Sequence, residues 1–288
     1  MIICKTQLSN EELQQVNTLG GLCAAHDGAA PLLYRNILLQ ERATASNIFY
    51  LQNNNLIGFL SVYFFYVDAC EISLMVHPNY RLQGIAKQLL HKILPILVTK
   101  QMRHLIFSAP VIMNPNWLKN YGFDYKSSQY TMQRLKKERV QIKNPRLSIK
   151  HATEVDIPTL DLIDSTCFES KSANMPARLK NLLVDPNYTI LTAVYEHSII
   201  GAVHLCWEEQ NALLSDLAIM PKQQGLGLGG ELLSYCINLA IDKGIAKITL
   251  HVENPKVINF YLHYDFKIIF ANDFWSVGFE NFFNCLFK

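Results

Sequence analysis

Residues 216–230 are the most informative stretch of the chain: Asp-Leu-Ala-Ile-Met-Pro-Lys-Gln-Gln-Gly-Leu-Gly-Leu-Gly-Gly. The apolar run 213–219, which a proline follows, predicts a strand, and the apolar run 230–241 predicts a helix. Four glycines lie at the turn between them, more than one or two left-handed turn residues would require. Backbone N–H groups at such a turn, with the positive end of the helix dipole, predict a site for a phosphate or pyrophosphate.

Two common phosphate-binding motifs fit this stretch poorly. Gly225-x-Gly227-x-x-Gly230 matches the dinucleotide fingerprint in form, and Glu253 lies about where a ribose-binding acid would lie. However, the polar residues 222–224 separate the strand from the first glycine, which in that motif follows the strand almost directly. A P-loop is excluded because no Lys-Ser/Thr follows the glycines. A nucleotide-dependent oxidoreductase is therefore disfavoured.

The chain repeats itself at an offset of 143 residues. Ile57-Gly58 recurs as Ile200-Gly201, Val76-His77-Pro78 as Ile219-Met220-Pro221, Gly84 as Gly227, and Tyr121-Gly122-Phe123 as Tyr264-Asp265-Phe266. Four landmarks in one register predict a duplicated domain, in agreement with a length of 288 residues at roughly 100–200 residues per domain. We expect domains at 1–138 and 148–288, joined by a charged, proline-bearing linker at 139–147.

Each copy has the same expected order of elements. The patterns Ser9-x-x-Glu12 and Thr153-x-x-Asp156 predict the start of the first helix. Strands are expected at 188–195 and 199–207 around a turn at His197-Ser198, with further strands at 71–76, 104–109, 213–219 and 247–252, and helices at 85–94 and 230–241. The predicted class is α+β (mixed α/β): two tandem domains, each with a mixed, mostly antiparallel central sheet flanked by helices.

The composition limits the class of protein. Half of the residues are hydrophobic, 17% are charged and the formal net charge is +2, which excludes a disordered chain and predicts neither a nucleic-acid nor a membrane partner. We expect no signal peptide and a cytoplasmic location. Seven scattered cysteines without a Cys-x-x-Cys pair, and nine histidines without ligand spacing, predict a reducing compartment and no metal site.

The two copies share a strand ending in Val/Ile-x-Pro and a loop Arg/Gln-x-x-Gly-x-Ala/Gly. Copy one has Val76-x-Pro78-x-x-Arg81-x-x-Gly84-x-Ala86, without the dinucleotide fingerprint, and copy two has Ile219-x-Pro221-x-x-Gln224-x-x-Gly227-x-Gly229. In this context the chain resembles the GNAT superfamily of acyl-CoA-dependent N-acyltransferases. Residues 254–266 are similar to the family's Asn-x-x-Ala-x-x-Phe-Tyr-x-x-x-Gly-Phe element, with Asp265 in place of glycine. At the 143 offset, copy one has Val111 and Leu118 where copy two has Asn254 and Tyr261.

The resemblance implies that copy two uses acetyl-CoA and no metal. The pantetheine arm would pair with Leu217, Ala218 and Ile219, whose last N–H would polarise the thioester carbonyl. Asn254 would reach the pantetheine or the phosphates, and Tyr261 would protonate the leaving thiolate. The pyrophosphate would lie on the backbone of Gln224, Gly225, Leu226, Gly227, Leu228, Gly229 and Gly230. In copy one, coenzyme A would meet Val76, Arg81, Gly84 and Ala86.

The base and the acceptor stay open at this point. The family's glutamate position corresponds to Leu213, which cannot serve, and Asp216, Glu208 and Glu209 are nearby alternatives. The acceptor would be a primary amine of a small molecule, peptide or protein, with Asp164 and Glu169 on its side of the cleft. The alternative is a non-catalytic acyl-CoA-binding regulatory protein, which the loop, asparagine and tyrosine retained in copy two disfavour.

Overall fold

The computed structural model describes residues 1–111, 116–144, 146–168 and 175–286. Glu169 lies outside the described residues. Contacts divide the chain into two compact units, Met1–Tyr130 with Phe270–Lys288 as unit 1 and Thr131–Ile269 as unit 2.

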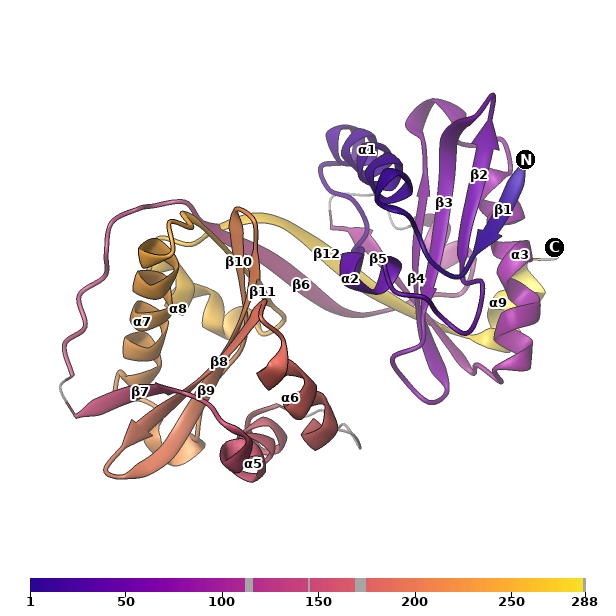
Figure 1. Cartoon of the computed structure of the whole chain (residues 1–288). Helices are drawn as coiled ribbons and strands as arrows, with labels where there is room; N and C mark the ends of the chain where they lie inside the picture. The colour runs from indigo at the N-terminus through magenta and orange to yellow at the C-terminus, as the bar shows by residue number, and fades with distance from the viewer. Residues whose placement is uncertain (112–115, 145, 169–174, 287–288) are drawn as a thin grey trace. The chain divides into compact units, whose positions relative to one another are not determined.

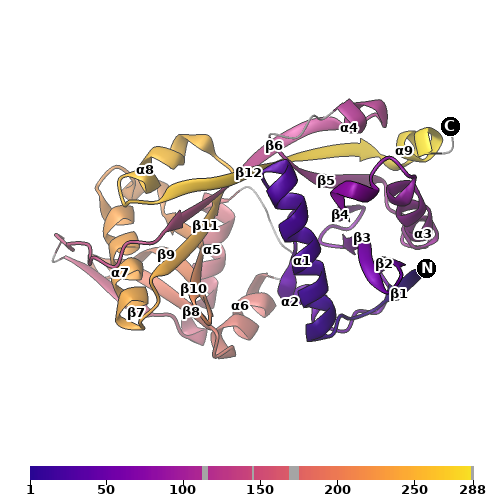
Figure 2. The same ribbon diagram turned by 90° about the horizontal axis from the view of Figure 1, so that it is seen from above.

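Unit 1 is a mixed sheet between two helical layers. Helix α1 covers one face, and α3 and α9 cover the other (Figure 2). The strand order is β1-β2-β3-β4-β5-β12, in which β4 and β5 are parallel and the pairs β1–β2, β2–β3, β3–β4 and β5–β12 are antiparallel. The strands are β1 (Ile2–Lys5), β2 (Asn47–Gln52), β3 (Asn55–Tyr63), β4 (Ala69–Val76), β5 (His104–Pro110) and β12 (Lys267–Gly278). The helices are α1 (Asn10–Asp27), α2 (Arg35–Leu38), α3 (Ile85–Thr99), α4 (Asn116–Asn120) and α9 (Phe279–Leu286).

Unit 2 repeats this plan. Its sheet has the order β6-β11-β10-β9-β8-β7, with α5 and α6 on one face and α7 on the other (Figure 1). The strands are β6 (Asp124–Arg134), which begins in unit 1, β7 (Leu147–His151), β8 (Tyr188–Tyr195), β9 (Ser198–Glu208), β10 (Asn211–Ile219) and β11 (Lys247–Val252). The helices are α5 (Ile157–Cys167), α6 (Met175–Val184), α7 (Leu228–Asp242) and α8 (Ile258–Leu262). The expected α+β class, with mixed, mostly antiparallel strands flanked by helices, is confirmed.

The last strand of each copy does not stay with the copy that encodes it. Phe270 onward lies in unit 1, where β12 pairs antiparallel with β5 and Phe274 faces Ser108. Thr131 to Arg134, the end of β6, lies in unit 2 beside β11. The sequence division at 148–288 does not contain this exchange, because a hydrophobic pattern predicts that a segment is a strand and not which strand it pairs with.

The charged segment between the copies is fixed to unit 2. Arg134 is 1% exposed and donates from Nε to Tyr264 O at 3.0 Å and from an Nη to Glu138 O at 2.8 Å. Val140 N–H donates to Asn238 Oδ1 at 2.8 Å, and Asn238 Nδ2 donates back to Val140 O at 2.8 Å. Part of the expected linker therefore lies along α7 through paired hydrogen bonds.

Capping signals predicted where the first helical segment of each copy begins. Ser9 and Thr153 both form capping boxes, with Glu12 and Asp156 respectively. Helix α3 differs, because it continues through Pro95 to Thr99 although the apolar pattern predicted an end at Leu94. Proline removes one helical hydrogen bond, and the apolar face of α3 nevertheless packs on the sheet with Leu97 fully buried.

Candidate active site

Strands β10 and β11 diverge at the centre of unit 2. They pair in parallel only from Asn211–Lys247 to Leu214–Leu250. Immediately after this, the register of β10 on β9 shifts between Ser215 and Ala218, and Asp216 has a φ of +51°. Such a bulge bends and twists the strand. The backbone of Leu217, Ala218 and Ile219 therefore continues beyond the β10–β11 ladder, as an extended ligand chain would require.

The close approach of β9 to this bulge requires a glycine. A Cβ built on Gly201 would lie 2.5 Å from Ala218 O and 2.5 Å from the Ile219 side chain. No larger residue fits without moving the bulge. Ile200-Gly201, which recurs in the repeat, thus lies where β9 packs closely against the bulged part of β10.

The glycine loop follows a 3₁₀ turn at Pro221–Gln223. Gln224 Nε2 donates to Ile219 O at 2.7 Å, which ties the loop to the end of β10. Gly225 and Gly227 have φ of +79° and +77°, and Gly227 caps α7. A Cβ at either position would meet nothing within 4 Å, so the space beside the loop is open. The first N–H groups of α7, on Leu228 and Gly229, point to this end of the helix, where anions are favoured.

Glycine is required at position 230 for a different reason from the one that applies at Gly225 and Gly227. It lies inside α7, and its N–H and that of Glu231 both donate to Gly227 O, at 3.0 and 3.2 Å. A Cβ at Gly230 would overlap the Tyr264 hydroxyl. The four glycines are therefore explained in part by helix packing and only in part by an open anion cradle.

The second motif forms a 3₁₀ turn and the short helix α8. Asn254 caps the turn, with Oδ1 accepting from Lys256 N at 3.0 Å. Asp265, where the motif has glycine, adopts a φ of +65°, and Lys136 Nζ donates to its carboxylate at 2.6 Å. The left-handed turn of the motif is thus preserved without glycine.

Tyr261 projects from α8 into an aromatic setting. Its ring contacts Phe260 edge-on at 4.9 Å between centroids and Phe266 at 5.9 Å. Burial raises the pKa of Tyr261 to about 12. The phenol therefore stays protonated at neutral pH and can donate a proton or a hydrogen bond.

A polar cluster lies on the face of the sheet that α5 and α6 cover. Asp216 extends from the bulge, and its Oδ2 lies 3.2 Å from His204 Nδ1 on β9. Ser215 Oγ donates to the same carboxylate oxygen at 3.1 Å. Burial opposes ionisation of Asp216, but His204 and then Arg178 outweigh it and hold the pKa of this carboxyl below its usual value.

Two more groups complete this cluster. Burial, followed by the charge of Asp216, raises the pKa of Asp164 on α5. The Tyr188 ring meets the His204 ring edge-on at 6.1 Å. The sequence pointed to Asp164 and Asp216 but not to His204 or Tyr188, because a lone histidine in an apolar strand carries no motif.

The other carboxylates considered as bases lie elsewhere. Glu208 and Glu209 are exposed in and beside the β9–β10 turn, where Glu208 Oε2 accepts from Asn211 Nδ2 at 2.9 Å. Leu213 faces Cys206 across the β9–β10 ladder. Of the three alternatives, the geometry places only Asp216 at the bulge.

Unit 1 repeats the loop with altered chemistry. Gly84 has a φ of +78° and caps α3, whose second residue is Ala86. Arg81 Nε donates to Val76 O at 3.1 Å, as Gln224 does to Ile219, and its two Nη atoms bind the Asp27 carboxylate at 2.8 and 2.6 Å. β4 leaves β5 after Ile72, but its register on β3 shows no shift. Leu118, at the position of Tyr261, is fully buried.

The Arg81–Asp27 pair gives a testable stability difference. Burial alone would raise the pKa of Asp27, but Arg81 and His26 hold it below its usual value. We expect Arg81→Gln to lower the free energy of unfolding at pH 7 by about 1 kcal/mol, since the pair is partly exposed.

A carboxyl with a lowered folded-state pKa stabilises above its unfolded pKa of about 3.9 and loses that contribution as the pH falls. The difference between Arg81→Gln and wild type in urea unfolding should therefore shrink below about pH 4. Lys180→Gln, which removes an exposed pair with Glu154 at 3.7 Å, is the control and should change little at either pH. A difference that grows on acidification would contradict this assignment.

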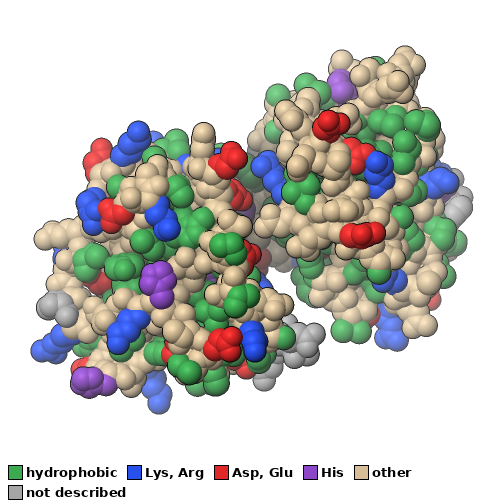
Figure 3. All heavy atoms as spheres, in the orientation of Figure 1, with side chains coloured by type: hydrophobic (Ala, Val, Ile, Leu, Met, Phe, Trp, Pro, Cys, Tyr) green, Lys and Arg blue, Asp and Glu red, His purple; other side chains and the backbone are tan. Residues whose placement is uncertain are grey.

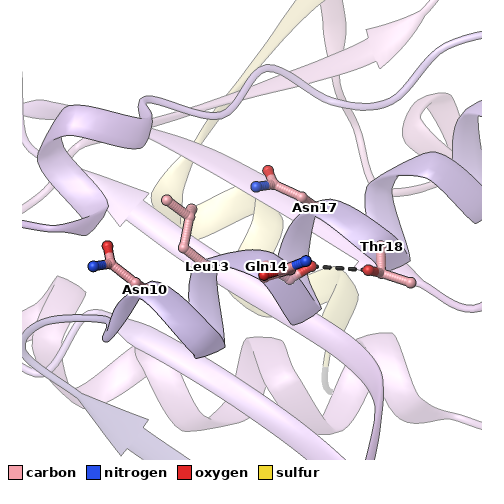
Figure 4. A pocket seen from close by; sticks show the side chains of 5 residues that line it. All are labelled: Asn10, Leu13, Gln14, Asn17 and Thr18. Carbon is pink, nitrogen blue, oxygen red and sulfur yellow. Dashed lines mark hydrogen bonds between the residues drawn. The ribbon is translucent and has the colours of Figure 1, made fainter. Parts of the chain in front are cut away.

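The surface has one hollow along α1 of unit 1 and another beside the glycine loop of unit 2. One, of about 470 Å³, is a shallow depression along α1 of unit 1, and all its side chains come from that helix (Figure 4). They are Asn10, Leu13, Gln14, Asn17 and Thr18, and Thr18 Oγ1 donates to Gln14 O at 2.9 Å. The other, of about 340 Å³, borders the 3₁₀ turn of unit 2 at Met220–Gln223.

On the face drawn in Figure 3, basic and acidic side chains are interspersed over both units.

Comparison with known proteins identifies the family. The model of the acetyltransferase (GNAT) family matches residues 18–116 and 157–266. The chain belongs to the GNAT family. One GNAT region lies in each copy of the repeat, so the resemblance derived from the two loops is confirmed, as is the tandem arrangement.

A curated relative is similar to part of this chain in sequence, and two solved structures share its fold. A segment of 113 residues is 34% identical to an uncharacterized ycf52-like N-acetyltransferase of Prochlorococcus marinus, covering 36% of this chain and 62% of the relative's length. A GCN5-related N-acetyltransferase of Sphaerobacter thermophilus shares the fold with a TM-score of 0.79, at 11% identity over 96% of this chain and 95% of that one. A tandem GNAT protein from the clavulanic acid biosynthesis pathway gives a TM-score of 0.72, at 14% identity over 96% and 98% of the two chains.

Two features are absent from the described part of this GNAT chain. None of its described helices is long and apolar enough to cross a membrane. Its described residues contain no group of three or more His, Cys, Asp or Glu side chains that could hold a metal ion.

Proposed function

We propose that unit 2 is an acetyl-CoA-dependent N-acetyltransferase that transfers an acetyl group to a primary amine of a small molecule, peptide or protein. The observation that carries the proposal is the divergence of β10 from β11 at the Asp216 bulge, directly before the glycine loop. It leaves an extended backbone edge next to an open helix N-terminus, which suits a ligand with a peptide-like arm and a pyrophosphate.

The residues present fit acetyl-CoA. The open space at Gly225 and Gly227 leaves room for phosphate oxygens beside backbone N–H groups. The edge of Leu217 to Ile219 would pair with the amides of the pantetheine arm, and Asn254 lies at the end of β11, on the other side of the divergence. Acetyl-CoA supplies an activated acyl group as a thioester when it is bound.

Two groups of this chain would act on the reacting atoms. The Ile219 N–H would donate to the carbonyl oxygen as negative charge develops there. Tyr261 would give its proton to the sulfur that leaves, since its raised pKa keeps the phenol protonated. The amine must attack as the neutral base, because an ammonium has no free electron pair. Its nitrogen forms the amide bond as the carbon–sulfur bond breaks, and the N–H proton that it then loses would restore the phenol of Tyr261.

For unit 1 we propose a binding role without transfer. Its loop residues Arg81, Gly84 and Ala86 and the strand end at Val76 keep the geometry of a coenzyme A cradle. Leu118 carries no proton to donate at the position of Tyr261.

We also propose that 1–138 and 148–288 are the two ancestral copies, whose last strands have been exchanged between the units.

The alternative is a non-catalytic acyl-CoA-binding protein, and turnover separates the two. We expect release of free coenzyme A from acetyl-CoA to accelerate when the right amine is supplied from a panel of small amines and peptides. Binding of acetyl-CoA without faster release for any amine would favour the alternative. Mass spectrometry of the accelerated reactions should find the acceptor heavier by one acetyl group.

A further inference from the structure

The bulge in β10 places an extra carboxylate beside a buried histidine. Ser215 faces His204 and Ala218 faces Ala202 across the β9–β10 ladder, so two residues of β10 stand opposite one of β9. In unit 1 the corresponding strands pair without a shift, and Ser61, at the position of His204, faces Ser73. The copy that lacks the tyrosine thus also lacks both the histidine and the bulge carboxylate.

His204 is an unusual core residue. It is 7% exposed, and its Nδ1 has no aligned hydrogen-bond partner among the described residues although it lies 3.2 Å from Asp216 Oδ2. A buried polar atom without a hydrogen bond is costly. The Asp216 side chain, in contrast, is 33% exposed, so its carboxylate reaches outward from the histidine behind it.

A second carboxylate lies on the helix that packs against this part of the sheet, since α5 contacts both β9 and β10. Asp164 on α5 interacts with the charge of Asp216. Two carboxylates that repel one another across a partly buried face favour a cation between them. The described groups that interact with Asp216 or Asp164 are Ser215, His204, Tyr188, Asp161, Cys167 and Arg178.

Resting on the transferase function proposed above, we propose that Asp216 and Asp164 bind the acceptor in its ammonium form, which loses a proton to solvent before the neutral amine attacks, with His204 as the positioning residue behind Asp216. The acceptor is then an aliphatic amine that carries positive charge in solution, rather than an arylamine or another uncharged nitrogen nucleophile. The site lies between the bulged strand and α5, on the sheet face opposite α7 (Figure 1). It adjoins Ala218 and Ile219, along which the acyl arm would lie.

The binding test uses the full chain and does not depend on turnover. The His204 ring resonances are followed by NMR while 1,4-diaminobutane is added, with 1,4-butanediol as the uncharged isostere. We expect a saturable shift with the diamine and none with the diol. Equal shifts with both compounds, or no shift with the diamine, would overturn the proposal.

Variants assign the effect to the two carboxylates. Asp216→Asn and Asp164→Asn should each weaken diamine binding roughly 10–100-fold, the worth of a hydrogen bond to a charged group. Glu209→Gln, which removes an exposed negative charge from the β9–β10 turn, should bind as wild type does. Acetyl-CoA affinity and the midpoint of thermal unfolding should stay close to wild type in the Asn variants, and equal losses in Glu209→Gln would overturn the assignment.

Transfer kinetics separate this proposal from the proposed function. In Asp216→Asn, KM for the amine should rise by the same factor as the dissociation constant of the diamine. Asp216→Glu should recover part of the lost affinity. If no amine in the panel accelerates release of coenzyme A while the diamine still binds, the transferase proposal fails and the cation site stands. If wild type transfers acetyl groups and both Asn variants keep the wild-type KM, the cation site fails alone.

The positioning role of His204 has its own signature in the pH profile. His204 holds the pKa of Asp216 down against the effect of burial. In His204→Gln the pKa of Asp216 should rise, so amine binding should be lost at a higher pH on acidification than in wild type. If His204→Gln lowers the affinity for the amine by the same factor at every pH, and the pH at which binding is lost does not change, His204 has a purely structural role.

Discussion

Tyr261→Phe is expected to slow acetyl transfer roughly 10²–10⁴-fold, which is the usual worth of a positioned general acid. The ring contacts with Phe260 and Phe266 remain, so the packing of α8 is preserved. Acetyl-CoA affinity should change little, because the hydroxyl acts as the thiolate leaves. The measurement is kcat with the amine identified from the panel, beside calorimetric binding of acetyl-CoA.

The pH dependence sharpens this prediction. An ordinary tyrosine is half ionised near pH 10, whereas burial raises the pKa of Tyr261 to about 12. Wild-type kcat should therefore show no loss from this group up to about pH 10. Tyr235→Phe, which removes a hydroxyl from α7 of the same unit, is the control and should keep wild-type turnover. A Tyr261→Phe enzyme with near-normal kcat would make Tyr261 a packing residue.

Gly227→Val is expected to abolish acetyl-CoA binding in unit 2, a loss of at least about 100-fold in affinity. The φ of +77° at Gly227 is unfavourable for a β-branched residue, and its side chain would enter the open concavity of the loop. Calorimetry should find one acetyl-CoA fewer per chain, and turnover should disappear with it.

Gly244→Val provides a matched control for backbone strain. Gly244 lies just beyond the other end of α7, with a φ of +76° and no atom within 4 Å of a built Cβ. Both variants should lose a similar 1–2 kcal/mol or so of stability from the left-handed backbone. Only Gly227→Val should lose the ligand. Equal loss of binding in both variants, or full binding in a folded Gly227→Val protein, would contradict the loop assignment.

The sequence predicted the parts of the site that depend on local patterns. A strand ending at a proline, a glycine loop and an apolar helix occur where the motif predicted them, because each follows from hydrophobic period and turn chemistry. Gly225 and Gly227 have the expected positive φ. Gly230 does not follow from the same reasoning, because its cause is the Tyr264 side chain, which lies 34 residues further along the chain.

What the sequence could not predict depends on pairing across the sheet. The bulge exists because β10 slips on β9 between Ser215 and Ala218, and an aspartate with positive φ carries no distinctive local signal. His204 becomes notable only when that slip brings Asp216 beside it. The same limit applies to β12, whose pattern is that of any final strand and whose partner, β5, lies in the first copy.

The exchange of final strands also orders the events of synthesis. As the ribosome produces the chain from its N-terminus, unit 1 has every strand except β12 long before residues 270–278 emerge. Until then β5 lacks the strand that pairs with it in the folded chain. Unit 1 therefore reaches its final strand pairing only after most of unit 2 has been made. A chain that stops at the boundary between the copies lacks β12, so premature termination removes a strand that belongs to unit 1 although unit 2 is the copy that is cut off.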